Sequence, residues 1–292
     1  MVNRPPILFL IPYFGAWPFW MPFFVQSCRA NPDIDWLLFS DCPVPDNLPP
    51  NVRVRSISYA DYCALAAQRM GIEFAPANPY KLCDIEPALG HIHENDLKGY
   101  EFWAFGDLDL FYGDLRAWLS DARLKRYDVL TTHARRVAGH LCVLRNTARY
   151  RQLFMRMKQW QQRFSDPQHH AMDEGAFSRL FVWRKNFPRP LFKLVGLFNP
   201  LRRASLFQEA YTTPNGCIAW RDGRHEFPER WYWRSGKVGN DLDAGPYPYF
   251  HFACWKRNEW RELAPQNASI LSAIAASGHW IVDTEGFHPG EP

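Results

Sequence analysis

The sequence contains no pair of cysteines in the C-x-x-C spacing, although it has seven Cys in 292 residues. The number is odd, and most of these residues stand among apolar neighbours, namely Cys63, Cys83, Cys142 and Cys254. This pattern is typical of reduced thiols that are buried in a cytoplasmic protein. We therefore expect neither a disulfide framework nor a structural zinc site.

Long apolar runs and internal repeats are also absent. The first apolar run, residues 7–11, is short, because Pro12, Pro18 and Pro22 interrupt the segment before a membrane-spanning length accumulates. No basic stretch with a small-residue cleavage site accompanies it. We expect a protein that has no signal peptide or spanning helix, stays in the cytoplasm, and is neither a solenoid nor a propeller.

A strong excess of one charge is missing as well. The net charge of +4 and the pI near 8.7 are mild, and the basic residues are scattered. Nucleic acid is therefore not expected as a partner. Hydrophobic residues make up 47% of the chain, which is enough for a sizeable core. The 13 Trp and 22 Phe suit both thick cores and surfaces that face sugars or lipids.

Strand and helix patterns alternate along the first two thirds of the chain. Short apolar runs predict strands at residues 7–11, 34–40, 52–57, 102–105, 129–132 and 141–145. Amphipathic spacing predicts helices at 17–29, 59–70, 81–95, 115–124, 150–164 and 173–181. Beyond residue 184 the alternation weakens, with strand-like pieces at 217–220 and 249–253. The sequence predicts an α/β fold with a Rossmann-like, nucleotide-binding mixed sheet flanked by helices.

Two carboxylates two residues apart, Asp107 and Asp109, follow the predicted strand at 102–105. Side chains with this spacing on extended backbone point the same way, and ligands collect at the carboxyl ends of strands in open α/β sheets. Oxygen ligands with positions left open suit Mg²⁺ or Mn²⁺ that also holds a diphosphate. A solvated turn is the alternative, but apolar neighbours on both sides make two bare carboxylates costly.

Three further groups of polar residues could serve the same cleft. Tyr80, Lys81 and Asp84 open a helix after Pro79 and could stack on a base, meet a phosphate and bond a base or ribose, unless they only begin an ordinary helix. In the second group, His251 could be a third metal ligand and Lys256 could contact the diphosphate. In the third group, Asp173 or Glu174 could act as a general base or orient the sugar. A core histidine and simple helix capping are the respective alternatives.

Residues 187–207 mix aromatic and basic side chains with few acids. Such a stretch, which includes Arg202 and Arg203, could rest on the anionic inner face of the membrane, where lipid-linked acceptors would lie. A packed aromatic linker fits the same composition.

The chain resembles a bacterial family of proposed glycosyltransferases, long labelled as a domain of unknown function and found near surface-polysaccharide genes. The resemblance covers residues 7 to 256. It rests on residues 11–15, Trp17-Pro18, Ser27-Cys28, Asn31-Pro32, 34–36, 79–84, 106–109, Gly139-His140, Asp173-Glu174 and His251.

The order of these parts is also similar to GT-A glycosyltransferases of the glycogenin-like and toxin-like kinds. This resemblance implies a GT-A-like core at residues 1–183, and an acceptor-side region at 184–292 that completes the same domain. It also implies a divalent cation and a nucleoside diphosphate sugar, with a UDP-sugar as the expected donor. It places Pro12, Tyr13, Phe14 and Leu108 near the nucleotide, Asp84 at the base or ribose, Lys256 at the diphosphate, and His140 and Trp255 near the acceptor.

The expected reaction is transfer of a sugar to a saccharide or a lipid-linked saccharide in surface polysaccharide synthesis. Phosphosugar transfer or nucleotide-sugar hydrolysis in the same cleft stays open, and so does a non-catalytic carbohydrate-binding protein. Asp173 and Glu174 are compatible with retention and with inversion of the anomeric configuration.

Overall fold

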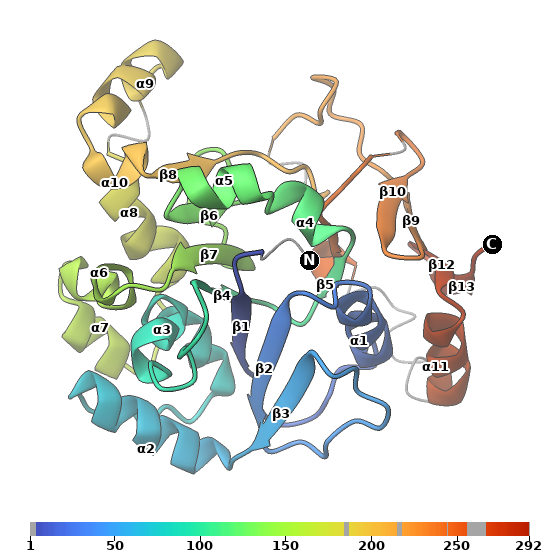
Figure 1. The fold of residues 1–292 in the computed structure, drawn as a ribbon, viewed down its shortest axis with the longest axis horizontal. Coiled ribbons are helices and arrows are strands. Elements are labelled where there is room, and N and C mark those ends of the chain that lie inside the picture. Colours follow the sequence, from blue (N-terminus) through green and yellow to red (C-terminus); the bar gives the residue numbers. More distant parts are fainter. Residues whose placement is uncertain (1–3, 184–186, 215–217, 244, 256–266, 292) are drawn as a thin grey trace.

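The computed structural model describes residues 4–183, 187–214, 218–243, 245–255 and 267–291. Within these residues a seven-stranded sheet runs in the order β3-β2-β1-β4-β7-β6-β8 (Figure 1). Neighbouring strands pair in parallel from β3 through β4, whereas β7 is antiparallel to both β4 and β6. Helices cover both faces of the sheet. The predicted α/β fold, a mixed sheet flanked by helices, is confirmed.

The N-terminal half follows from apolar runs with clear end signals. Residues 7–11 are buried, as in a strand that is covered on both faces. Ser58 caps α2 by accepting a hydrogen bond from the Asp61 amide at 3.1 Å, and Gly71 ends the helix with φ at 67°. The elements of this half are β1 (Ile7–Pro12), α1 (Met21–Arg29), β2 (Asp35–Ser40), β3 (Val52–Ser56), α2 (Tyr59–Met70) and β4 (Phe102–Gly106).

Several predicted helices are wrong in length or type. The helix expected at 81–95 is the 3-10 helix η1 (Pro79–Ala88) followed by α3 (Leu89–Ile92), since Pro87 removes one donor from an α-helical ladder. The helix expected at 115–124 breaks at Ser120, whose backbone is extended, and the one at 150–164 breaks after Arg151 and again at the extended Met157 and the left-handed Gln159. The pieces are α4 (Leu115–Trp118), α5 (Asp121–Arg126), α6 (Ala148–Arg151), η2 (Leu153–Arg156) and α7 (Trp160–Ser165).

Two other helix boundaries differ from prediction. Helix α1 begins at Met21 and not at residue 17, because Pro22 fits the first turn of a helix and no later turn. The helix expected at 173–181 is a single-turn π-helix, η3 (Asp173–Phe177), that continues into α8 (Ser178–Phe181). Such π-helical turns are rare and occur frequently at functional sites.

The C-terminal part adds to the large sheet and builds a second one. Strand β8 pairs with β6, β11 pairs with β5, and four strands form a separate sheet in the order β10-β9-β12-β13. The strand expected at 217–220 is not formed at 218–220, and Cys217 lies outside the described residues. The remaining strands are β5 (Leu110–Tyr112), β6 (Val129–Thr131), β7 (Leu141–Arg145), β8 (Ser205–Phe207), β9 (Arg230–Arg234), β10 (Lys237–Asn240), β11 (Tyr249–His251), β12 (His279–Asp283) and β13 (Gly286–Pro289).

Most of the aromatic side chains are used for packing. Two buried clusters lie on the opposite faces of the large sheet, with alternate residues of β1 contributing to each. A third cluster, beneath the small sheet, contains Trp231, Trp233 and Trp280, and the rings of the last two stack with centroids 5.5 Å apart. Burial of such rings contributes strongly to stability. The remaining helices are η4 (Phe252–Cys254) and α11 (Ala268–Ala276).

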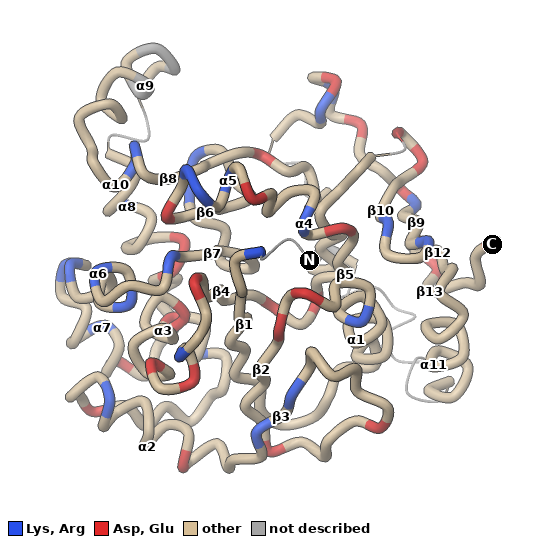
Figure 2. The backbone as a smooth tube through the Cα atoms, in the orientation of Figure 1, with Lys and Arg blue, Asp and Glu red and all other residues tan. Residues whose placement is uncertain are grey.

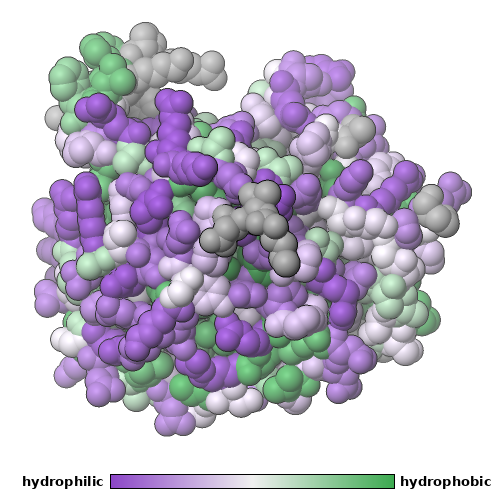
Figure 3. All heavy atoms as spheres, viewed as in Figure 1, coloured by the Kyte–Doolittle hydropathy of each residue, from purple (hydrophilic) through white to green (hydrophobic). Residues whose placement is uncertain are grey.

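One apolar element stands out on the surface. Acidic and basic residues are interspersed along much of the described backbone (Figure 2), but α9 (Arg189–Leu197) exposes Leu191, Leu194 and Leu197, and Phe198 follows it. Figure 3 shows apolar residues gathered over this helix, which leads into α10 (Pro200–Arg203). In the described part of the chain, no helix has the length and apolar character needed to cross a membrane.

Candidate active site

A short strand pairing brings the acidic loop and His251 together. Asp107 and Asp109 follow β4, and Leu110 then begins β5. In the antiparallel pair of β5 and β11, Leu110 lies opposite His251, and the Phe252 amide donates a hydrogen bond to the Asp109 carbonyl at 2.8 Å. Residues that are distant in sequence are therefore fixed beside each other by backbone hydrogen bonds.

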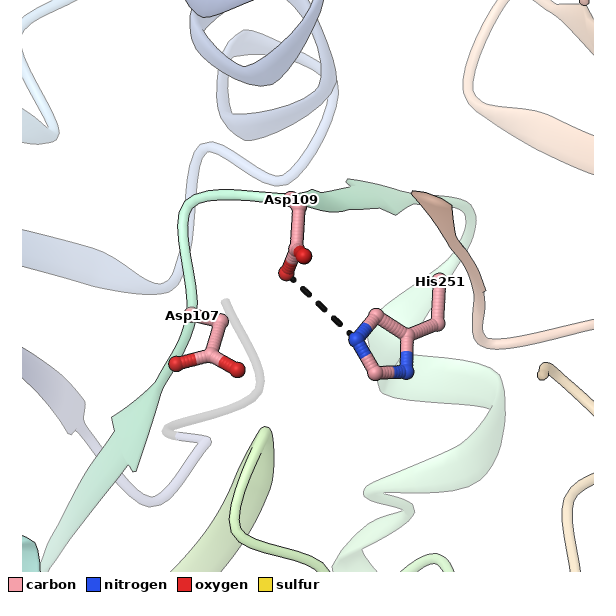
Figure 4. Close-up of side chains that lie close together, drawn as sticks. All are labelled: Asp107, Asp109 and His251. Atoms are coloured by element: carbon pink, nitrogen blue, oxygen red, sulfur yellow. Dashed lines mark ion pairs between the residues drawn. The ribbon is translucent and has the colours of Figure 1, made fainter. Parts of the chain in front are cut away.

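The side chains of Asp107, Asp109 and His251 converge on one point (Figure 4). One ligand atom of each lies within 4.8 Å of the others, and His251 Nε2 is 3.5 Å from Asp109 Oδ1. Asp109 and His251 are buried, and Asp107 is half-buried. Two carboxylate oxygens and one imidazole nitrogen fit Mn²⁺ or Mg²⁺ and leave coordination positions for a diphosphate.

Neighbouring groups hold the His251 ring in place. Its Nδ1 lies 2.9 Å from the Thr213 hydroxyl, so Nε2 is the nitrogen that faces Asp109. Partners of this kind orient a metal-binding imidazole. The ring of His140 lies alongside, with centroids 4.1 Å apart, and its Nε2 is 2.8 Å from the Tyr249 hydroxyl. Burial, with a further contribution from His251, holds the pKa of His140 well below its usual value, so this neighbour is uncharged.

A cavity of about 600 Å³ opens at the carboxyl ends of β1 and β4 beside these side chains. It contains most of the site residues that the sequence predicted: Pro12, Tyr13, Phe14, Tyr80, Asp107, Leu108, Asp109, His140, Asp173, Glu174 and His251. Trp20 and Glu86, which were not predicted, also line it, as do Cys83, Gly139 and His169 from segments that the sequence singled out. The volume is in the range of small-molecule sites.

Asp173 and Glu174 lie in the first turn of η3 and face the same cavity. Asp173 is buried, and Glu174 Oε2 forms an ion pair with Arg136 Nη1 at 2.8 Å. Burial, together with the charges of Glu174 and Asp107, raises the pKa of Asp173 to about 7. A carboxyl group with this pKa can exchange a proton near neutral pH. Gly139 packs directly against the Asp173 carboxylate.

Lys81 and Asp84 are placed differently from the prediction that they contact the nucleotide. They form a buried ion pair, Nζ to Oδ2 at 2.8 Å, and neither residue lines the cavity. The Asp84 carboxylate also accepts hydrogen bonds from the amides of His170 and Met172 at 2.9 and 3.0 Å. Because all these partners come from the protein, we assign the pair a structural role in anchoring the segment that leads to η3.

Trp255, the predicted acceptor residue after β11, does not line the cavity. Trp255 belongs to the third buried cluster, where its ring contacts Phe250 with centroids 5.3 Å apart. Trp255 is therefore a core residue. Lys256, the predicted diphosphate contact, lies outside the described residues.

Glu86 is a cavity residue that the sequence reasoning missed. It is only 6% exposed, and its Oε2 has no hydrogen-bond partner. Burial, with further contributions led by Asp107 and Asp173, raises the pKa of its carboxyl well above the usual value. A glutamate inside the apolar stretch 82–89 was the available signal, because a buried carboxyl group needs a partner or a proton.

Fold and site together define an α/β protein with a candidate cation site at the carboxyl edge of its sheet. The chain belongs to the family of unknown function DUF6625, whose model matches residues 9–275. The family description names no activity. A search of curated proteins found no match.

Solved structures with remote similarity include several sugar transferases. The galactosyltransferase LgtC, in complex with donor and acceptor sugar analogues, is 11% identical, with a TM-score of 0.43 over 92% of this chain and 95% of its own. Mouse xyloside xylosyltransferase 1 is 12% identical, with a TM-score of 0.42 over 85% of this chain and 98% of its own. GlyE of Streptococcus pneumoniae is 11% identical, with a TM-score of 0.41, and 63% of its length is covered. At such low TM-scores these structures say nothing by themselves about the activity of this chain.

Proposed function

We propose that this chain is a divalent-cation-dependent glycosyltransferase that takes a nucleoside diphosphate sugar, with a UDP-sugar as the expected donor. The observation that carries this proposal is the convergence of Asp107, Asp109 and His251 inside a cavity at the carboxyl ends of parallel strands. Ligands of α/β sheets bind at this edge, and the three side chains leave room for phosphate oxygens on a shared ion.

A bound Mn²⁺ or Mg²⁺ would stabilise the charge of the departing diphosphate. Asp107, Asp109 and His251 would hold that ion, and the β5–β11 ladder fixes Asp109 and His251 beside each other. The burial of Asp109 and His251 excludes water from their side of the site and strengthens these electrostatic contacts.

The aromatic rings at the mouth of the cavity fit the nucleotide end of the donor. Tyr80 is 61% exposed and lines the cavity, and its ring centroid lies 4.7 Å from that of His169. Tyr13 lines the same cavity beside Phe14. We assign Tyr80 the base and assign Pro12, Tyr13, Phe14 and Leu108 the surrounding nucleotide contacts.

Asp173 is the residue we assign to the acceptor hydroxyl. Its pKa of about 7 suits a group that receives a proton at neutral pH, and its neighbour Glu174 is held by Arg136. His140, which follows the Gly139 that packs against Asp173, would face the acceptor. The stereochemistry of the product distinguishes two roles for Asp173: a general base in an inverting reaction, or a group that orients the sugar in a retaining one.

The apolar helix α9 fits an acceptor that is carried by a lipid. Its exposed leucines face solvent in the described structure, and Arg203 lies exposed on the following helix. Arg202, in contrast, stacks over Phe207 at 4.1 Å. We propose that residues 187–207 rest on an anionic membrane surface and that the product is a surface polysaccharide.

The test is a screen of nucleotide sugars by melting temperature with and without Mn²⁺, followed by product analysis with the best donor. A Mn²⁺-dependent rise that disappears in Asp109→Asn, with release of a nucleoside diphosphate, supports the proposal. Release of a nucleoside monophosphate would indicate phosphosugar transfer instead. Saccharide binding with no response to any nucleotide sugar would indicate a carbohydrate-binding protein.

A further inference from the structure

A second cavity, of about 680 Å³, adjoins the first and shares Glu174 with it. Its walls come from the loop after β6, from η3 and α8, and from the segment that leads into α9. The lining residues are His133, Arg135, Arg136, Glu174, Gly175, Ser178, Arg179, Val182, Phe187 and Pro188.

Arginines predominate among the described residues that line this cavity. They are Arg135, Arg136 and Arg179, and the one carboxylate among these lining residues, Glu174, pairs with Arg136 at 2.8 Å. The positive field acts on the neighbouring His133, whose pKa is lowered to about 4 by burial and then by Arg136 and Arg135. Guanidinium groups present several donors in one plane, and this geometry matches phosphate and carboxylate oxygens.

The position of the cavity indicates which molecule would bring an anion there. Glu174 lies on the wall that it shares with the candidate active site, and Phe187 and Pro188 lie directly before α9. A molecule with its reacting end at Asp173 can therefore extend past Glu174 toward the arginines. The donor diphosphate does not need this space, because its proposed place is at Asp107 and Asp109.

We propose that the second cavity binds an anionic group, phosphoryl or carboxylate, carried by the acceptor at a distance from its reacting hydroxyl. The identification of this ligand as the acceptor rests on the proposed glycosyl transfer. The binding of an anion by the arginines stands without it. An acceptor of this class is a sugar phosphate, a lipid-linked diphosphate saccharide or an acidic saccharide.

The test is calorimetric titration with two probes, inorganic pyrophosphate and glucuronate, in EDTA so that no cation occupies the first cavity. The variant is Arg135→Gln/Arg179→Gln, since both residues are exposed on the surface. Its control is Arg149→Gln/Arg156→Gln, which removes two exposed arginines elsewhere.

We expect at least one probe to bind the wild-type protein and the control, with affinity that falls as salt rises. The affinity of the Arg135→Gln/Arg179→Gln variant for that probe should fall tenfold or more. Asp109→Asn should bind the probe as tightly as the wild type does. Preference for pyrophosphate identifies a phosphoryl group, and preference for glucuronate identifies a carboxylate. Vesicles that contain phosphatidic acid then separate a lipid-borne phosphate from a soluble one.

Failure of both probes to bind, or equal affinity in the variant and the wild type, would overturn this proposal. The proposed glycosyl transfer is tested separately on the same proteins by Mn²⁺-dependent nucleotide-sugar binding in the first cavity. That binding should survive the Arg135→Gln/Arg179→Gln change, so the two failures are distinguishable.

Discussion

Lys81 Nζ lies 2.8 Å from Asp84 Oδ2, and both side chains are almost completely buried. The ammonium group also donates hydrogen bonds to the carbonyls of Arg163 and Gln168 at 2.8 and 2.6 Å. The pair thus joins η1 to the end of α7 and to the loop before η3. It supports the wall of the cavity that carries Asp173, although neither Lys81 nor Asp84 lines the cavity.

Removal of one partner should therefore cost stability before it costs ligand binding. In Lys81→Met the Asp84 charge stays buried without its counter-ion, and the free energy of unfolding should fall by about 3–5 kcal/mol. Urea denaturation measures this change, and Lys98→Met, at an exposed lysine, is the matched control. Unchanged stability with lost nucleotide affinity would instead place Lys81 at the nucleotide.

The carboxyl group of Asp173 makes stability depend on pH. Its folded-state pKa of about 7 lies above the ordinary 3.8, so the folded protein binds the extra proton between these values. The contribution of Asp173 to the free energy of unfolding is therefore largest below about pH 4 and falls as the pH rises toward 7. Asp173→Asn should gain about 2–3 kcal/mol over the wild type between pH 5 and pH 8, as an upper estimate. Denaturation curves in EDTA check this, and a stability difference that is constant with pH would contradict it.

Gly139 keeps the space that the Asp173 carboxylate occupies. A Cβ at this position would overlap Asp173 and crowd Glu174. Gly139→Ala should lose about 1–3 kcal/mol of stability, because a packed site tolerates little added volume. The loss should largely disappear in Gly139→Ala/Asp173→Ser. Gly175→Ala, where a Cβ meets nothing closer than 4.0 Å, is the control. Equal losses of stability in Gly139→Ala and Gly175→Ala would show that the contact between position 139 and Asp173 does not determine the loss.

The membrane contact of α9 can be separated from folding, because Leu194 and Leu197 are more than half exposed. Leu194→Glu/Leu197→Glu should abolish co-sedimentation with anionic vesicles and leave the melting temperature within a few degrees of the wild type. Ile270→Glu makes the same kind of change on α11, at an equally exposed site. Vesicle binding that is unaffected in the double variant but lost in Ile270→Glu would move the contact surface elsewhere.

The parts of the fold with strong local signals were predictable. Residues 7–11 form an uninterrupted apolar run, and α2 has both a serine cap and a terminal glycine. The acidic pair was visible for the same reason, since Asp107 and Asp109 directly follow a buried strand. These features depend on neighbours in sequence.

The remaining features depend on contacts between distant segments. No local sequence pattern predicts that β11 pairs with β5, yet this pairing places His251 beside Asp109. Lys81 and Asp84 have the composition of a ligand site, but the loop before η3 supplies their partners. The four-stranded sheet was missed because its strands are only four or five residues long, which is too short for a clear periodic pattern.

The most direct measurement is a titration of Mn²⁺ into the protein in the presence of UDP. The electron paramagnetic resonance signal of free Mn²⁺ monitors how much of the ion is bound. We predict one bound ion per chain in the wild type and in the exposed control Asp46→Asn. Affinity should fall roughly 100-fold or more in Asp109→Asn and about tenfold in Thr213→Val, which removes the partner of His251. Equal Mn²⁺ affinity in the wild type and in Asp109→Asn, or no UDP-dependent binding at all, would contradict the cation site and with it the proposed activity.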